Sequence, residues 1–250
     1  MRIAVFAAFV FGAVLPLAAQ GGADWSYQGK TGPLEWGKLG PAYAACTNGH
    51  EQSPVDIRSA HLNKALQPIE FHYIAGAMTL ENDGRTIIVH PNRGSYLIAS
   101  GVRYDLDRIE FRHPSEHTVK GRFSDLEAQL VHRSADGKYA IVAVRLSELR
   151  GIGDANAILA ALWEHLPAKA GTTEKITDMI NPAGLLPADR GYWTYTGSLT
   201  TPPCTEGVKW FVFEREMSIS RTQLRAFTAL FRMNTRPVQD LHGRKIEANE

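Results

Sequence analysis

Short apolar runs separated by turn-forming residues dominate the chain after residue 80. Strands are predicted over 85–90 and 95–100, joined as a hairpin by the turn Pro91-Asn92-Arg93-Gly94. The same pattern predicts further strands over 104–112, 125–132, 139–146 and 209–216. The run over 139–146 is apolar enough to lie inside a sheet. The hydrophobic pattern therefore indicates a mainly β protein.

Helices are few in this pattern. One is predicted over 155–166, where Asp154 stands at the cap position, and another over 221–232, where Ser220 and Gln223 form a capping-box pattern. The apolar residues at helical spacing in the second helix are assigned to the core: Leu224, Phe227, Leu230 and Phe231.

The first residues follow a different pattern. Met1 and Arg2 precede an uncharged apolar run over 3–19 that ends on small residues, which is typical of a secretory signal peptide cleaved after Ala19. A membrane anchor is the competing interpretation, because the run is near the lower length limit for a span, but Pro16 interrupts it. We therefore expect a signal peptide over 1–19, one domain over 20–250, no membrane span in the mature chain, and a periplasmic or secreted protein.

Composition narrows the classes of function. The chain has 250 residues, 27 Lys+Arg against 26 Asp+Glu and 44% hydrophobic positions, which excludes a disordered protein and a strongly basic nucleic-acid binder. Because the net charge is near zero, it gives no steering toward a membrane or a polyanion. The absence of linkers, repeats and low-complexity runs favours a single domain. Cys46 and Cys204 can pair in an oxidising compartment.

Two motifs carry a resemblance to a known family: Gln52-Ser53-Pro54-Val55-Asp56-Ile57, and the run from Tyr192 to Pro203 that reads YWTYTGSLTTPP. With the aromatic segment 25–36 and the segments 114–117 and 234–237, they resemble the α-class carbonic anhydrases over the whole mature chain. The resemblance implies a ten-stranded, mostly antiparallel twisted sheet with short peripheral helices, and a conical cavity with zinc at its floor. It also places Cys46 and Cys204 where bacterial members carry a disulfide.

In active members of this family two histidines alternate on one strand and a third lies on the neighbouring strand. Residues i and i+2 of a strand face the same side, so the imidazoles converge on one ion. The matching positions here are Glu110, Arg112 and Gln129. Arginine has no lone pair for a metal, and glutamine offers only a weak amide oxygen. We therefore expect no metal or other cofactor, with zinc expected only if the chain is an active enzyme.

The three replacements also predict an internal substitute for the ion, in which Arg112 donates to Glu110 and to the amide oxygen of Gln129. A one-residue shift of the strand, which would make His113 a ligand, is rejected. It would turn Ile109 and Phe111 into the cavity and would recover only one histidine of three.

Other site positions are partly retained. Thr200 and Glu116 match the family's hydroxyl–carboxylate pair, and Glu127 matches the partner of the third ligand. Arg108 stands where a glutamine supports the first histidine, and Arg85 stands where fast members carry a proton-shuttling histidine. Arginine does not titrate near neutral pH, so it cannot take over that shuttle. The resemblance implies further cavity positions at Thr201, Val131, Ile141, Trp210 and Arg108, and aromatic core or cavity-wall positions at Trp25, Tyr27, Trp36 and Trp193.

Our main interpretation of the sequence is a non-catalytic family member with a binding role, acting through an unidentified protein partner. The reason is that zinc lowers the pKa of bound water from about 15.7 to about 7, and no other nucleophile is evident. Two alternatives stay open: an active or weakly active carbonate dehydratase with an atypical site, and a pocket for a small anion at Arg112, with Arg85 and Arg108. No nucleic-acid partner is expected, and a homodimer is consistent with the resemblance to bacterial members.

Overall fold

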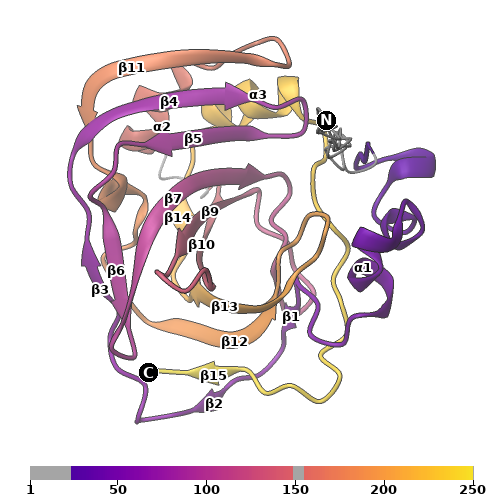
Figure 1. Cartoon of the computed structure of the whole chain (residues 1–250). Helices are drawn as coiled ribbons and strands as arrows, with labels where there is room; N and C mark the ends of the chain where they lie inside the picture. The colour runs from indigo at the N-terminus through magenta and orange to yellow at the C-terminus, as the bar shows by residue number, and fades with distance from the viewer. Residues whose placement is uncertain (1–23, 149–154, 250) are drawn as a thin grey trace, which may run out of the picture.

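The computed structural model describes residues 24–148 and 155–249, and one twisted sheet forms its body (Figure 1). Within these residues, ten strands follow one continuous path in the order β11-β4-β5-β7-β9-β10-β13-β12-β15-β2. Strands β3, β6 and β14 pair at the sides of this path, and β1 and β8 form a separate two-stranded sheet. Most neighbours are antiparallel, whereas β10 and β13 run parallel. The mainly β fold with a mostly antiparallel sheet, predicted from the sequence, is confirmed.

The strands are β1 Asp56–Ile57, β2 His61–Leu62, β3 Glu70–His72, β4 Gly76–Asn82, β5 Ile87–Pro91, β6 Tyr96–Ala99, β7 Val102–Arg112, β8 Thr118–Val119, β9 Leu126–Arg133, β10 Tyr139–Ser147, β11 Thr172–Ile180, β12 Tyr192–Ser198, β13 Glu206–Phe213, β14 Met217–Ser218 and β15 Glu247–Ala248. The α-helices are α1 Ala45–Asn48, α2 Ala157–Trp163 and α3 Arg221–Leu230. Four short 3-10 helices complete the description: η1 Gly29–Thr31, η2 Trp36–Lys38, η3 Pro41–Tyr43 and η4 Pro182–Leu185.

The predicted hairpin between residues 85–90 and 95–100 is wrong. Strand β5 pairs with β4 and with the end of β7, whereas β6 pairs with β3 and with the beginning of β7. Because β7 is 11 residues long, it has room for both neighbours. The hairpin in this region joins β6 to β7 through Ser100 and Gly101, whose φ angles of 50° and 75° suit a two-residue turn.

The helices begin at residues whose side chains accept hydrogen bonds from backbone N–H groups. Asn156 caps α2 by accepting from the backbone of Ile158 and Leu159, while the predicted cap Asp154 lies outside the described residues. The capping box of Ser220 and Gln223 at α3 is confirmed. The Gln223 amide also bonds the backbone of Asn156 in both directions, which fixes α3 against α2.

Alternation along β7 separates the main core from the candidate site. Ile109 and Phe111 are 1% and 0% exposed and belong to the large hydrophobic cluster. Phe111 packs edge-on against Trp163 of α2 at 4.9 Å between ring centroids. Since successive side chains of a strand point to opposite faces, Glu110 and Arg112 face away from this core.

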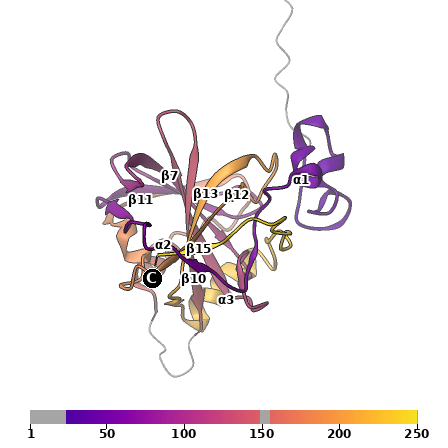
Figure 2. The same ribbon diagram turned by 90° about the horizontal axis from the view of Figure 1, so that it is seen from below.

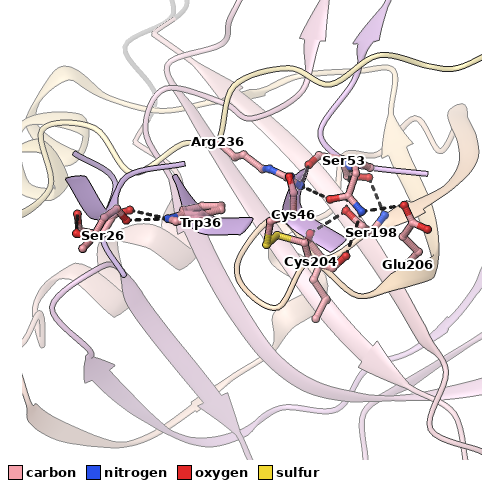
Figure 3. Close-up of a disulfide and its surroundings, with 11 residues drawn as sticks. Ser26, Trp36, Cys46, Ser53, Ser198, Cys204, Glu206 and Arg236 are labelled. Atoms are coloured by element: carbon pink, nitrogen blue, oxygen red, sulfur yellow. Dashed lines mark hydrogen bonds between the residues drawn. A yellow bond between two sulfur atoms is a disulfide. The ribbon is translucent and has the colours of Figure 1, made fainter. Parts of the chain in front are cut away.

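The N-terminal segment, residues 24–48, stands to one side of the sheet, where Figure 2 shows α1. The Cys46–Cys204 disulfide ties it to the loop before β13, which confirms that pairing. Figure 3 shows that Arg236 also reaches this junction, where its guanidinium donates to the carbonyl oxygen of Cys46 at 2.8 Å. Buried Trp36 donates its indole N–H to the carbonyl oxygens of Ser26 and Thr31. Among the described residues, no helix combines the length and apolarity needed to cross a membrane.

Candidate active-site floor

Strands β7 and β9 place four polar residues on one face of the sheet. Glu110 lies opposite Gln129, and Arg112 lies opposite Glu127. Together with Glu116, which follows β7 in the chain, they form a group that we call the floor cluster. These five residues are between 0% and 8% exposed, so their charges are balanced within the protein.

Arg112 is the central cation of the floor cluster. Its Nη2 donates to Glu110 through a short contact, its Nη1 donates to the carbonyl oxygen of Phe111 at 3.2 Å, and its Nε lies 3.6 Å from Glu116 Oε2. Burial would lower the pKa of Arg112, but Tyr27, Glu110 and Glu116 together raise it above its ordinary value. The guanidinium is therefore a permanent charge held between two acids.

A second guanidinium, that of Arg108, joins buried Glu110 to Asp107 nearer the surface. Arg108 Nε donates to Glu110 Oε1 at 2.6 Å, and Arg108 Nη1 donates to half-exposed Asp107 at 2.7 Å. Burial alone would raise the pKa of Glu110, but Arg112 and Arg108 lower it below the ordinary value. Glu110 is thus ionised and bonded on both oxygens.

Gln129 does not take the role expected from the sequence. Its Nε2 donates to Glu116 Oε2 at 2.7 Å and to Glu127 Oε1 at 2.9 Å, and the predicted bond from Arg112 to the Gln129 oxygen is not formed. The physical reason is that two buried carboxylates flank Gln129, and its amide N–H groups are the donors that can separate them.

Glu116 and Thr200 are brought together, as the resemblance implies for this pair. The Thr200 hydroxyl donates to Glu116, which also accepts from the backbone N–H of Arg236 at 3.0 Å. Burial raises the pKa of Glu116 above its ordinary value, with nearby Glu127 adding to the increase and Arg112 opposing it. Glu116 is accordingly the acid of the floor cluster that gains a proton most readily.

Behind the floor cluster a buried hydrogen-bond chain reaches the first sequence motif. Glu127 accepts from the backbone N–H of His117 at 2.9 Å and bonds the His117 ring at 3.0 Å. His117 Nε2 lies 2.7 Å from the Tyr195 hydroxyl, which lies 2.9 Å from Ser53 Oγ. Burial would raise the pKa of Glu127, but the bonded His117 lowers it. The chain fixes Glu127 beside Gln129.

The other residues assigned to the site from the sequence separate into two groups. Val131, Ile141 and Trp210 are at most 2% exposed and form part of the second hydrophobic cluster, and Thr201 follows Thr200 at an intermediate exposure. Arg85, in contrast, is engaged with the N-terminal segment. It donates to Asp24 at 2.6 Å and to the Trp25 carbonyl oxygen at 2.9 Å, and it stacks over the Trp25 ring.

Two residues of this region were not assigned a polar role from the sequence. Tyr27 is 8% exposed, its hydroxyl is buried without a hydrogen-bond partner among the described residues, and burial raises its pKa well above the ordinary value. Arg236 donates to Gln52 Oε1 and to the Ser53 carbonyl oxygen, both at 2.8 Å. Burial lowers the pKa of Arg236 to about 10. The only sequence signal for these two residues was their position in the segments 25–36 and 234–237, which carry part of the family resemblance.

The chemistry of these side chains can be tested against zinc, the metal that the resemblance implies. Tetrahedral zinc takes cysteine sulfur, histidine nitrogen or carboxylate oxygen. At the three implied positions, Arg112 has no lone pair to give a metal and Gln129 turns its amide nitrogen to two acids. The third, Glu110, is already bonded by two guanidiniums. Residues 24–148 and 155–249 contain no group of three or more His, Cys, Asp or Glu placed to hold a metal. These residues do not fit zinc.

Comparisons with known proteins identify the relatives of the chain. The family model of the eukaryotic-type carbonic anhydrases matches residues 31–250. A carbonic anhydrase of Klebsiella pneumoniae is 40% identical over 227 residues, which is 90% of each chain. The structure of an α-carbonic anhydrase from Thermovibrio ammonificans with the inhibitor sulfanilamide has 39% identity and a TM-score of 0.87, covering 91% of this chain and all of that one. The structure of dioscorin complexed with ascorbate has 32% identity and a TM-score of 0.83, covering 90% of this chain and 97% of that one.

These relatives contradict the main functional interpretation of the sequence. We expected a non-catalytic protein because the three zinc-ligand positions are changed. The relatives from Klebsiella pneumoniae and Pectobacterium carotovorum, 40% and 34% identical over at least 90% of each chain, are both named carbonic anhydrase. They favour the alternative of an active or weakly active carbonate dehydratase with an atypical site.

Proposed function

Because this chain belongs to the eukaryotic-type carbonic anhydrase family, we propose that it interconverts carbon dioxide and bicarbonate slowly at the floor cluster. The observation that carries the proposal is the Thr200–Glu116 hydrogen bond beside Arg112, on a scaffold whose relatives are named for this activity. Dehydration and hydration both need an oriented oxygen atom and stabilisation of the bicarbonate charge, and these residues supply the two requirements.

Each residue has a separate task in this proposal. Because the Thr200 hydroxyl gives its hydrogen to Glu116, its lone pairs are free to accept a hydrogen bond from an O–H group of water or bicarbonate. The positive charges of Arg112 and Arg108 favour the bicarbonate anion that forms when the oxygen of water bonds to the carbon of carbon dioxide and the water releases a proton to the solvent buffer. A metal-bound water has a lowered pKa, but the described residues contain no group of three or more His, Cys, Asp or Glu placed to hold a metal, so we expect slow turnover.

The proposal includes a floor cluster that works without zinc. The Arg112 guanidinium is bonded to Glu110 and its Nε lies 3.6 Å from Glu116, so a metal ion could reach these two carboxylates only by displacing it. We also propose a periplasmic or secreted location, which the Cys46–Cys204 disulfide supports because such bonds persist in oxidising compartments.

Stopped-flow measurement of carbon dioxide hydration, on protein whose zinc content has been determined, tests the function. We expect hydration above the buffer blank with far less than one zinc per chain. Thr200→Ala should lower the rate at least about tenfold, whereas exposed Thr205→Ala, in the same loop, should leave it unchanged. Hydration equal to the blank would refute the enzymatic proposal, and stoichiometric zinc would refute only its zinc-free part.

A second candidate is the binding of a small oxyanion beside Arg112. The Arg112 Nε and the Tyr27 hydroxyl are buried donors without a hydrogen-bond partner among the described residues, and the Arg112 charge acts on Tyr27. A planar oxyanion offers acceptors for both donors. Calorimetric titration with bicarbonate and with nitrate should give saturable heat that Tyr27→Phe reduces several-fold. The absence of saturable heat with either anion would eliminate this candidate.

A further inference from the structure

A further concave site lies outside the floor cluster. It is a hollow of about 930 Å³, a volume typical of small-molecule sites, and no residue of the floor cluster lines it. We call it the Trp193 hollow. Its walls come from residues 119–123 at the end of β8 and after it, Arg145 and Ser147 of β10, Asp189 before β12, Trp193 on β12, and residues 214–216 after β13.

A tight turn carries two positive side chains, Lys120 and Arg122, to this hollow; we call them the turn cations. Val119 and Arg122 exchange backbone hydrogen bonds at 3.0 and 3.1 Å. Between them Lys120 and Gly121 have φ angles of 52° and 76°, both positive as a type I′ turn requires. Asp56 anchors the turn by accepting from the backbone N–H of Gly121 at 2.8 Å. Because lysine rarely adopts a positive φ, its presence here is a strained choice of the kind found at functional sites.

The charges of the hollow leave positive charge unbalanced at this turn. Of the other positive side chains in the lining, Arg145 bonds Glu216 at 2.8 Å. Arg215 lies 3.9 Å from Asp189. The turn cations are exposed and form no ion pair within residues 24–148 and 155–249. An anion that enters the hollow therefore meets two charges that no carboxylate of the described chain engages.

Trp193 gives the hollow an aromatic wall. Its ring is intermediate in exposure and lies 5.5 Å from the guanidinium of Arg145, which is itself 4% exposed. The Nε of Arg145 is buried and has no hydrogen-bond partner among the described residues, so a donor beside the hollow is left unpaired. Ser147 and Asp189 add a hydroxyl and a carboxylate, which accept hydrogen bonds. The lining therefore combines a flat apolar ring with cations and acceptors.

We propose that the Trp193 hollow binds an acidic carbohydrate, a short chain of hexuronate residues. The sugar carboxylate pairs with the turn cations, the sugar ring lies against Trp193, and sugar hydroxyls donate to Asp189 and Ser147. A neutral sugar leaves the turn cations unused, whereas an aromatic acid has no hydroxyls for Asp189 and is repelled by its charge. All parts of the lining thus find partners in a ligand that is both charged and hydroxylated. This site is separate from the proposed catalytic function and does not depend on it.

Calorimetric titration of the chain as cells produce it with digalacturonate tests the site. We expect saturable heat, and Lys120→Ala and Arg122→Ala should each raise the dissociation constant about tenfold, because each removes one charge-assisted contact. Lys64→Ala is the matched control, since Lys64 is exposed, forms no ion pair among the described residues and does not line the hollow, and it should leave the constant unchanged. Heat that does not saturate, or a constant indifferent to both turn variants, would overturn the proposal.

Two other ligands separate the charged part of the proposal from the hydroxylated part. Galactobiose, the neutral counterpart, and benzoate, an aromatic acid without hydroxyls, should each bind at least about tenfold more weakly than digalacturonate. Equal affinity for galactobiose would contradict the role of the turn cations, and equal affinity for benzoate would contradict a carbohydrate ligand.

Tryptophan fluorescence locates the bound sugar. Digalacturonate should change the emission of the unmodified protein, which contains five tryptophans. Trp193→Phe keeps an aromatic wall and should remove that change, because the sugar then contacts no tryptophan. A fluorescence change that persists in Trp193→Phe would place the sugar away from this hollow.

Discussion

At the scale of single residues, the floor cluster is organised by one buried cation. Arg112 is 1% exposed and lies between Glu110 and Glu116, which are 8% and 0% exposed. A buried carboxylate is costly unless it is paired and hydrogen-bonded, so each acid depends on the guanidinium for its charged form. Replacing different members of the floor cluster should therefore change the stability of the protein by different amounts.

Replacing Arg112 by methionine should destabilise the protein by about 3 to 5 kcal/mol, because it leaves Glu110 and Glu116 buried without their shared cation. Urea unfolding at pH 7 measures this change. Arg103→Met, which removes an exposed pair with Asp105, should change the free energy of unfolding by less than about 1 kcal/mol. A loss for Arg112→Met no larger than this control would contradict the ion-pair description.

Acid should reveal the same pairing through Glu110. Its pKa is lower in the folded protein than in the unfolded chain, so Glu110 contributes stability above its unfolded pKa. That contribution is lost as the pH falls below the ordinary value for glutamate, about 4.3, and through the lower folded pKa. Glu110→Gln should therefore be less stable than the unmodified protein at pH 7, and the difference should shrink toward pH 3.

Urea titrations at both pH values check this dependence, with exposed Glu174→Gln as the control that shows no such trend. The effect of Glu116 on the pH dependence of stability has the opposite sign, because burial raises its folded pKa. The free energies of unfolding of Glu110→Gln and the unmodified protein could instead differ by the same amount from pH 7 to pH 3. That result would show that the pKa of Glu110 is not lowered in the folded protein.

At the scale of elements, strand alternation made part of the site predictable. The apolar pattern of Ile109 and Phe111 places Glu110 and Arg112 on the opposite face, and the structure pairs Glu110 with Gln129 across β7 and β9. Pairing between distant segments was not predictable in the same way. The wrong hairpin arose because the edge that β5 presents is taken by β7, a choice that no local turn residue encodes.

The directions in which side chains point could not be predicted from the sequence either. The amide of Gln129 turns to Glu116 and Glu127 because the fold brings two acids to it, one on its own strand and one from outside β9. Tyr27 reaches Arg112 from a segment 85 residues away, on the difference of their numbers. Such orientations depend on tertiary contacts, whereas faces of strands depend on period alone.

The register of β7 and β9 leads to a prediction about metal binding. Changing Glu110, Arg112 and Gln129 together to histidine should raise zinc binding toward one per chain, since three imidazoles would then share one face. Glu127 and Glu116 remain in place to orient the new ligands. Arg112→His alone should bind much less zinc, because one histidine with a carboxylate and an amide is a weak set. Metal analysis after dialysis measures both variants, and a folded triple variant without added zinc would show that the three positions do not converge.

At the scale of the whole molecule, segments that are far apart in the sequence meet at one junction. The disulfide joins Cys46 to Cys204, while Arg236 bonds Cys46, Gln52 and Ser53 from the C-terminal segment. This junction fixes the N-terminal segment, which brings Tyr27 close enough to Arg112 for the two to interact electrostatically. The surroundings of the floor cluster thus depend on contacts between segments that are far from it in sequence.

Removing the disulfide should therefore affect more than stability. Its cysteines are 158 residues apart, and in the chain-entropy model a loop of that size contributes about 5 kcal/mol by restricting the unfolded chain. Cys46→Ser with Cys204→Ser should lower the free energy of urea unfolding by several kcal/mol, because the unfolded chain gains freedom. Proteolysis under native conditions should then cut between residues 28 and 48 faster than in the unmodified protein, since the N-terminal segment would lose its disulfide and keep only noncovalent contacts, among them those of Arg85 and Arg236. Equal cleavage rates at both disulfide states would mean that the hydrogen bonds of Arg85 and Arg236 suffice to hold that segment, and that the disulfide acts on the unfolded chain alone.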